Sequence, residues 1–224
     1  MARLHVLRVF VNEDGEWGNP LGVFLDGAEV AVGERQRIAT ELGFSETVFV
    51  DDRGRGELQI FTPAAELPFA GHPLVGTARL LRREGAEVAR LRPPAGEVGV
   101  RFEDGLTFVD AEPAWAPGFE SMQFPDSAAV RALDGLPGDA DAVYAWAWID
   151  EDAGTIRARA FAPSFGIAED EATGSAALAL SAELGRRITV NQGRGSLLIA
   201  QPLRGGRAEV GGGVALDETR EFAP

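Results

Sequence analysis

The side chains that could carry chemistry in this 224-residue chain are few, because cysteine and lysine are absent and histidine occurs only as His5 and His72. Without cysteine there is no thiolate nucleophile, disulfide or thiolate-bound metal. Without lysine there is no Schiff-base chemistry and no lysine of a phosphate-binding loop. Two histidines are too few for a three-histidine centre, so we expect no metal. Acid–base work is left to carboxylates, His72, Tyr144 and hydroxyls.

Glu46 and His72 are the first candidates for that work. Glu46 opens the apolar run 47–50, where burial would raise its pKa towards a range useful for moving protons. The competing interpretation is a surface glutamate after a turn. Pro73 suits a first helical position, which would make His72 the N-cap. A cap residue at the mouth of a cleft can hydrogen-bond a ligand, and a helix N-terminus lowers a histidine pKa, which favours the neutral imidazole.

The elements that must position these residues show an internal repeat. Residues 58–63 and 156–163 each read as a strand that ends in Phe-x-Pro. In each case a loop with acidic residues and glycine follows, and then a helix that is small or apolar almost all round, at 74–81 and 175–182. A helix without a polar face is normally buried. We therefore expect two similar lobes, each a curved sheet wrapped around one central helix.

The fold class predicted from this pattern is α+β, with mostly antiparallel sheets and two pseudo-symmetric lobes. The proline-containing stretch Glu112 to Pro117 marks the boundary, giving lobes 1–112 and 113–224, with the last strand a candidate to return to the first lobe. The expected helices are 34–42, 74–83, 126–133 and 175–184; the expected strands are 4–11, 21–25, 46–50, 58–62, 143–149 and 155–161, with two or three short ones between 87 and 110.

Charge and hydropathy narrow the class of partner. The net charge of −14 disfavours nucleic acid as a partner. No apolar run reaches the roughly 18 residues of a membrane span, and residues 1–10 do not read as a signal peptide, so we expect no membrane partner and a cytoplasmic location. An anionic substrate would need a local positive field. Two helix N-termini that converge on one cleft would supply it, because each carries about half a positive charge and unpaired N–H groups.

Backbone donors at those N-termini are the candidate anion-binding groups. Gly71, Gly174 and Ser175 should offer N–H groups to a substrate carboxylate or enolate, and Ser175 adds a hydroxyl. Asn19 is a weaker candidate for substrate binding, because the Asn-Pro turn that contains it explains it structurally.

Several blocks of the sequence match a known pattern in order. They are Gly18-Asn19-Pro20, Ser45-Glu46-Thr47, Phe61-Thr62-Pro63, Glu66 to Pro73 (ELPFAGHP), Glu169 to Ala176 (EDEATGSA), Gln192-Gly193 and Gly195-Ser196. In these blocks, from residue 8 to about residue 200, the chain resembles the phenazine-biosynthesis PhzF-like isomerases. The resemblance implies a diaminopimelate-epimerase-like fold, a homodimer, no cofactor, and proton-transfer isomerisation of the kind performed by the family's dihydro-hydroxyanthranilate isomerase.

Family roles are carried over by the positions that match. Glu46 matches the catalytic general acid/base, His72 a substrate-positioning histidine, and Asp170 a second positioning acid. Acidic residues flank Asp170 on both sides, so position rather than composition selects it, and the alternative is an acidic loop that favours the dipole of the next helix.

The chain also departs from the family. It is shorter, and the deficit falls between about residues 111 and 155. Glu171 replaces a proline that is common after the Glu-Asp pair, and the Gln192 block is compressed. These differences affect the expected substrate more than the expected mechanism.

The expected activity is cofactor-independent isomerisation of a small carboxylate-bearing substrate by proton transfer. One alternative is an amino-acid-type racemase or epimerase, although diaminopimelate epimerases use two cysteines and this chain has none. A second is a non-catalytic protein that binds a small anion. A third, two-carboxylate glycoside hydrolysis by Glu46 and Asp170, lacks the aromatic-rich sugar cleft that we would expect.

Overall fold

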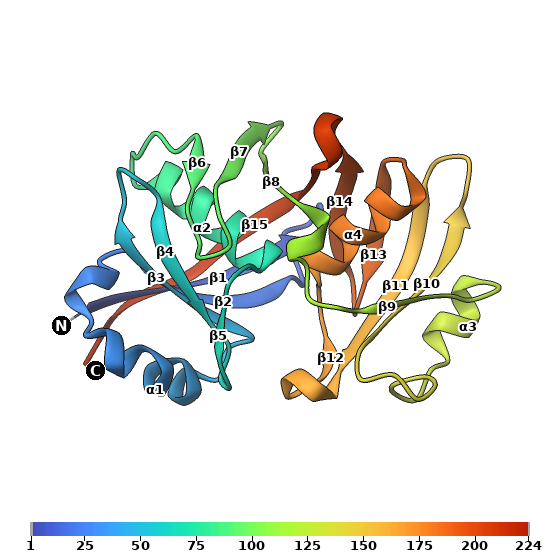
Figure 1. Ribbon diagram of the computed structural model, residues 1–224, viewed down its shortest axis with the longest axis horizontal. Coiled ribbons are helices and arrows are strands. Elements are labelled where there is room, and N and C mark those ends of the chain that lie inside the picture. Colours follow the sequence, from blue (N-terminus) through green and yellow to red (C-terminus); the bar gives the residue numbers. More distant parts are fainter. Residues whose placement is uncertain (1, 224) are drawn as a thin grey trace.

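Two lobes lie side by side in the computed structural model, which describes residues 2–223 apart from the side chain of Phe165 (Figure 1). The strands of these residues join into one sheet whose main path runs β5-β4-β3-β2-β1-β15-β14-β13-β11-β10-β9. Side branches add β12, which pairs with β11, and the series β6, β7 and β8, which joins the sheet where β8 pairs with β15.

The first half of the chain supplies one end of this path. Antiparallel β1–β2 and β3–β4 pairs flank a parallel β2–β3 pair. The elements are β1 Ala2–Val11, β2 Asn19–Phe24, η1 Gly27–Glu29, α1 Val32–Leu42, β3 Glu46–Asp52, β4 Glu57–Phe61, β5 Glu66–Leu67, α2 Gly71–Arg83, β6 Arg90–Leu91, β7 Val98–Glu103 and β8 Leu106–Ala111.

The second half has a similar order of elements. A parallel β9–β10 pair is followed by the antiparallel β10–β11 hairpin, and then by a short strand and a buried helix. The elements are η2 Pro113–Trp115, β9 Glu120–Gln123, α3 Ser127–Arg131, β10 Val143–Asp150, β11 Thr155–Ala162, η3 Pro163–Phe165, β12 Ile167–Asp170, α4 Gly174–Leu184, β13 Ile188–Gln192, β14 Ser196–Pro202, η4 Arg204–Gly206 and β15 Ala208–Phe222.

The long strand β15 connects the two halves. Its residues 213–222 pair antiparallel with β1, and its residues 208–211 pair antiparallel with β14. The strand therefore runs from one lobe into the other (Figure 1). Its first residues also pair with β8. The last strand thus pairs with the first strand of the chain, while the division into lobes 1–112 and 113–224 stays a prediction.

The core lies around two helices, α2 and α4. Ten residues of α2 and seven of α4 are buried, because their sequences lack a continuous polar face. The apolar faces of β1, β2, β11 and β14 pack against them in one continuous cluster. The two buried central helices agree with the predicted α+β class.

The start of α2 differs from the expectation. The helix begins at Gly71 with Ala70 as N-cap, so His72 and Pro73 occupy the second and third helical positions. Proline is tolerated there because none of the N–H groups in the first turn has an intrahelical partner. The proline signal therefore located the first turn correctly but not the residue at which the helix begins.

Two glycine-to-alanine substitutions, one in α2 and one in α1, should change the stability of the protein in opposite directions. A Cβ at Gly76 would lie 2.5 Å from Leu21 Cδ2 and 2.7 Å from Val9 Cγ2, whereas a Cβ at Gly33 in α1 would meet nothing within 4 Å. Gly76→Ala should lower the free energy of unfolding by about 1–3 kcal/mol through overpacking. Gly33→Ala should raise it by about 0.5 kcal/mol through helix propensity. Urea unfolding measures both, and a stabilised Gly76→Ala variant would contradict this packing.

Candidate active site

The N-termini of α2 and α4 meet through two glycines. A Cβ on Gly71 would lie 3.0 Å from the carbonyl carbon of Gly174 and 3.0 Å from the Ser175 nitrogen, and one on Gly174 would lie 3.2 Å from the His72 nitrogen. Only glycine permits backbones this close. The expected convergence of two helix N-termini is thus observed.

The ring of Phe10 packs against this junction. Its φ of 69° lies in the left-handed region that a bulky residue seldom adopts, and it falls where the pairing of β1 with β15 changes register. A Cβ on Gly174 would lie 3.0 Å from Phe10 Cζ, so the ring packs directly against the start of α4. The strained backbone places the aromatic ring beneath the two helix ends.

The junction is electropositive. Neither helix has a side-chain N-cap hydrogen bond, and each N-terminus carries roughly half a positive charge. The first-turn N–H groups have no intrahelical partners. Pro73, in the first turn of α2, has no N–H group to offer. An anion at this point would satisfy both the free donors and the converging dipoles.

A cavity of about 180 Å³ opens beside the junction. Its polar groups come from both halves of the chain: Glu46 at the head of β3, Asp170 at the end of β12, and Thr173 and Ser175 at the start of α4. The rest of the wall is mainly apolar and includes Ala64, Ala65, Leu67, Ala70, Pro117, Phe119, Ala162 and Ile167. Such a cavity suits a small molecule with one acidic end.

Glu46 and His72 form a buried pair. Glu46 Oε2 lies 3.1 Å from His72 Nε2, and the backbone carbonyl of Pro20 accepts a hydrogen bond from the imidazole. If Nδ1 carries that hydrogen, Nε2 of the neutral ring is an acceptor that faces the carboxyl. Burial lowers the pKa of His72 to about 3. Neither of these two buried atoms has a hydrogen-bond partner among the described residues, so a proton on Glu46 Oε2 would lie close to the Nε2 lone pair.

The pKa of Glu46 moves in the matching direction. Burial raises it well above the usual value, and the nearby charge of Asp170 raises it further. A neutral carboxyl facing a neutral imidazole leaves no unpaired charge in the site. Both pKa shifts therefore favour the neutral form of each side chain.

Asp170 is held by a separate set of donors. Its Oδ1 accepts from Asn19 Nδ2 at 2.7 Å and its Oδ2 accepts from Thr173 Oγ1 at 2.7 Å. Burial raises its pKa to about 6, while the Thr173 and Asn19 hydrogen bonds oppose that rise. Asp170 is consequently more easily ionised than Glu46, and the two carboxyl groups differ in role.

Three polar residues that the sequence analysis did not select hold this arrangement. Gln192 Oε1 accepts from the Thr173 backbone N–H and from the Tyr144 hydroxyl, each at 3.1 Å, and its Nε2 donates to Thr173 Oγ1 at 2.9 Å. Ser45 Oγ donates to Asn19 Oδ1 at 2.9 Å. The resemblance blocks contained Ser45, Thr173 and Gln192, but their partners are distant in sequence.

The structure separates the candidate residues into four groups. Glu46, Asp170 and Ser175 line the cavity, while Asn19 lies behind Asp170. Gly71 and Gly174 form the helix contact. The expectation that His72 lies at the mouth of the cleft as an N-cap is wrong, because its side chain is only 4% exposed and faces Glu46 from within the protein.

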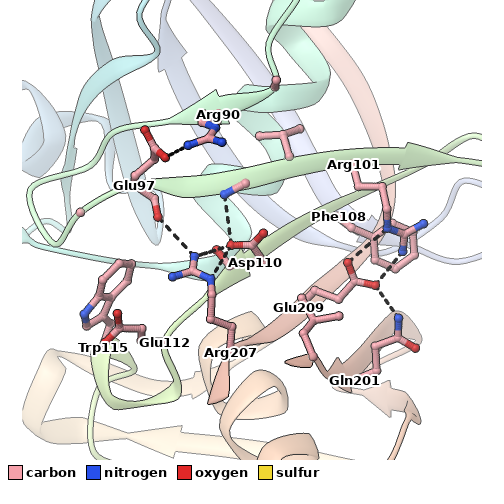
Figure 2. A pocket seen from close by; sticks show the side chains of 15 residues that line it. Arg90, Glu97, Arg101, Phe108, Asp110, Glu112, Trp115, Gln201, Arg207 and Glu209 are labelled. Carbon is pink, nitrogen blue, oxygen red and sulfur yellow. Dashed lines mark hydrogen bonds and ion pairs between the residues drawn. The ribbon is translucent and has the colours of Figure 1, made fainter. Parts of the chain in front are cut away.

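A wider depression of about 880 Å³ lies between the β6–β8 region and β14–β15 (Figure 2). Its three arginines are each ion-paired: Arg90 with Glu97, Arg101 with Glu209 at 2.7 Å, and Arg207 with Asp110. Gln201 also donates to Glu209 at 2.6 Å (Figure 2). These contacts fasten β15 to the β7–β8 hairpin, so we assign this depression a structural role.

Two classes of feature are not found among residues 2–223. No group of three or more His, Asp or Glu side chains is placed to hold a metal ion. No helix in this part of the chain is long and apolar enough to cross a membrane.

Comparison with known proteins gives a consistent result. The family model described as phenazine biosynthesis-like protein matches residues 8–130 and 139–207. The trans-2,3-dihydro-3-hydroxyanthranilate isomerase of Pseudomonas aeruginosa is 33% identical over 87% of this chain and 84% of its own length.

Solved structures agree with the fold. A phenazine biosynthesis protein of the PhzF family from Enterococcus faecalis aligns with a TM-score of 0.77 at 21% identity, covering 100% of this chain and 99% of that one. A predicted epimerase from Pseudomonas aeruginosa aligns with a TM-score of 0.75 at 25% identity over 100% of both chains. The predicted fold class is thereby confirmed.

The raised pKa of Glu46 predicts how its replacement changes stability with pH. The folded protein keeps this proton above pH 4.5, where the unfolded chain releases it. The stability that this proton contributes is therefore lost as the pH rises from 4.5 towards the pKa of Glu46 in the folded protein. Glu46→Gln should gain stability relative to wild type as the pH rises above 4.5, by at most about 1.4 kcal/mol per pH unit.

Urea unfolding across that range measures the difference. The matched control is Glu57→Gln, since the Glu57 side chain is 39% exposed and pairs only with Arg55 at the surface. Its difference from wild type should stay constant with pH. Parallel curves for Glu46→Gln and wild type would show that Glu46 is ionised in the folded protein.

Proposed function

The chain belongs to the phenazine biosynthesis-like protein family, and on that premise we propose that it isomerises a small conjugated carboxylate by moving a proton with Glu46. Its curated relatives from Pseudomonas are isomerases, and the 25%-identical structural relative is a predicted epimerase, so the enzyme class is isomerase. The substrate, the roles of individual residues and the absence of a cofactor belong to the proposal.

One observation carries the mechanism: Glu46 stands in a small cavity with His72 Nε2 behind it and Asp170 beside it. General acid–base catalysis is most efficient when the pKa of the catalytic group approaches the working pH. Burial and the Asp170 charge raise the pKa of Glu46 in that direction. His72 Nε2 is an acceptor that can share the Glu46 proton.

The proton transfer balances between the ionised form of Glu46 and the substrate. Once Glu46 has released its own proton to solvent, its carboxylate takes a proton from a substrate carbon. The electron pair of the broken C–H bond spreads through the conjugated system towards the substrate carboxylate. Glu46 then returns a proton to a second carbon, and a new C–H bond forms there. No electron acceptor is required, because the substrate and product differ only in where the hydrogen is attached.

The helix junction would stabilise the charge that develops during this step. The substrate carboxylate docks against the N–H groups at the starts of α2 and α4, with the Ser175 hydroxyl beside it. Charge that moves onto this carboxylate in the enolate-like state meets preorganised donors and two helix dipoles. Asp170, held by Asn19 and Thr173, positions a cationic or hydroxyl group of the substrate.

The cavity limits the substrate to a compact molecule. A volume of about 180 Å³ with an apolar wall that includes Leu67, Phe119 and Ile167 fits a single ring with few substituents. We infer a cyclic or conjugated carboxylate of the dihydro-hydroxyanthranilate kind, the substrate named for the Pseudomonas relative.

Epimerisation is the second candidate, because Glu46 and Asp170 reach one cavity from different halves of the chain. Two bases on opposite faces of one carbon would invert a stereocentre. Both Asp170 oxygens already accept hydrogen bonds, however, so this carboxylate is better placed to orient than to collect a proton. Inversion at a single carbon, instead of transfer between two carbons, would favour the epimerase.

Replacement of Glu46 tests the proposed role directly. Glu46→Gln should lower the rate of hydrogen exchange into substrate in D₂O by at least about a hundredfold while leaving binding measurable. Proton NMR with a panel of small carboxylates, trans-2,3-dihydro-3-hydroxyanthranilate included, follows the label. Glu57→Gln is the surface control and should match wild type. Full activity of Glu46→Gln would remove it from the central role; tight binding without exchange by wild type would indicate a binding protein.

The Thr173 hydroxyl should set the acid limb of the pH–rate profile. Thr173→Val removes a hydrogen bond to the ionised form of Asp170, so the Asp170 pKa, about 6 in the native protein, should rise. The acid limb should then move to higher pH by about one unit. Thr189→Val, on β13, is the matched control and should leave the profile in place. An unmoved acid limb in Thr173→Val would show that Asp170 ionisation does not govern turnover.

A further inference from the structure

The segment that carries Asp170 into the cavity has a second pocket on its other side. Asp170 lines the cavity described above, whereas its neighbours Glu169 and Glu171 line a pocket of about 560 Å³. Its lining residues lie in or beside α3, β11, β12 and the turn between β13 and β14, which are elements of the second half of the chain (Figure 1). Its cationic lining residues are Arg131, Arg157, Arg159 and Arg194; we call it the arginine pocket.

Two of these arginines are neutralised by the glutamates. Arg159 pairs with Glu169 at 2.7 Å and also donates to the last carbonyls of α3, so its guanidinium is fully engaged. Arg194 pairs with Glu171 at 3.1 Å but remains 70% exposed, with its guanidinium over the Trp17 ring at 4.9 Å. Arg194 therefore keeps N–H groups that face solvent.

The other two arginines have no carboxylate partner. Arg131 is exposed, and its side chain makes no ion pair with any residue in the described part of the chain. Arg157 donates to the carbonyls of Asn191, at 3.2 Å, and Gly193, and its buried Nε has no hydrogen-bond partner. Burial lowers the pKa of Arg157, and the charges of Arg131 and Arg159 lower it further.

This excess of positive charge is local and opposes the rest of the molecule. Four arginines face two glutamates in the pocket, while the whole chain has a net charge of −14. An arginine without a partner beside other arginines gains from an anion that bridges them, because guanidinium groups bind carboxylate and phosphate oxygens through paired hydrogen bonds.

We propose that the arginine pocket binds a small multivalent oxyanion, a phosphate or a polycarboxylate, held by Arg131, Arg157 and Arg194. The pocket is separate from the cavity at Glu46, so this site does not depend on the proposed isomerase chemistry. It is linked to that cavity through Glu171, whose carboxylate accepts from Ser196 Oγ at 2.9 Å, while Ser196 Oγ accepts from the Gly18 N–H at 3.0 Å.

Titration calorimetry at low ionic strength tests the site, with inorganic pyrophosphate and citrate as the two probes. Arg131→Gln and Arg194→Gln should each weaken binding about tenfold, the effect of one lost charge-assisted hydrogen bond. Arg204→Gln is the control: it changes the net charge equally at an exposed arginine of η4 that makes no ion pair in the described residues. Arg157 is left intact because its carbonyl contacts fasten β11 to β13.

A second readout localises the anion. Trp17 lies beneath Arg194, so its indole NMR signal should shift when pyrophosphate binds to wild type or to Arg204→Gln. In Arg131→Gln the same shift should need about a tenfold higher pyrophosphate concentration, in agreement with the loss of affinity measured by calorimetry. Glu46→Gln should bind pyrophosphate as wild type does, which keeps this test independent of catalysis.

Three outcomes overturn the proposal: no binding of either probe at millimolar concentration, equal weakening by Arg204→Gln, or binding that survives both pocket substitutions. The last would place the anion elsewhere, for example at the helix junction. Preference for pyrophosphate over citrate identifies a phosphate site, and the reverse identifies a polycarboxylate site; either supports the proposal.

Discussion

The close contact between two helix N-termini is the constraint on which the rest of the site depends. Gly71 and Gly174 bring the positive ends of α2 and α4 within van der Waals distance, which is unfavourable unless negative charge lies nearby. Both helices are buried and neither has a side-chain cap. The surrounding sheet therefore holds the two N-termini together, and the cost of this approach is offset by the large apolar core around the same helices.

Burial then divides the three ionisable groups at this junction by charge state. Burial and the Asp170 charge raise the pKa of Glu46, and burial lowers the pKa of His72, which faces it. Asp170 has two donors from Asn19 and Thr173, so it is the group best able to stay ionised. The proton-transfer role that we propose for Glu46 rests on these differences in burial and in hydrogen-bond partners.

A strongly acidic chain can bind an anion only where positive potential is concentrated. Here two such places lie on either side of one segment. Helix dipoles act at the cavity, and unpaired guanidinium groups act in the arginine pocket. Asp170 and Glu171, consecutive in sequence, face these two places, and Ser196 and Gly18 join Glu171 to the strand that begins at Asn19. The identity of residue 171 therefore matters to both pockets.

The sequence by itself determined the parts of this protein that depend on local patterns. Apolar helices, short strands and the Phe-x-Pro repeat predicted the α+β lobes. The matching blocks selected Glu46, Asp170 and Ser175, because each of these residues lies within a motif that is continuous in the sequence. Only the tertiary structure decided the depth of His72, the partner of its Nε2, and the bridge from Asn19 to Asp170, which are 151 residues apart. The physical reason is that a pKa depends on burial and on through-space neighbours, and a sequence motif contains neither.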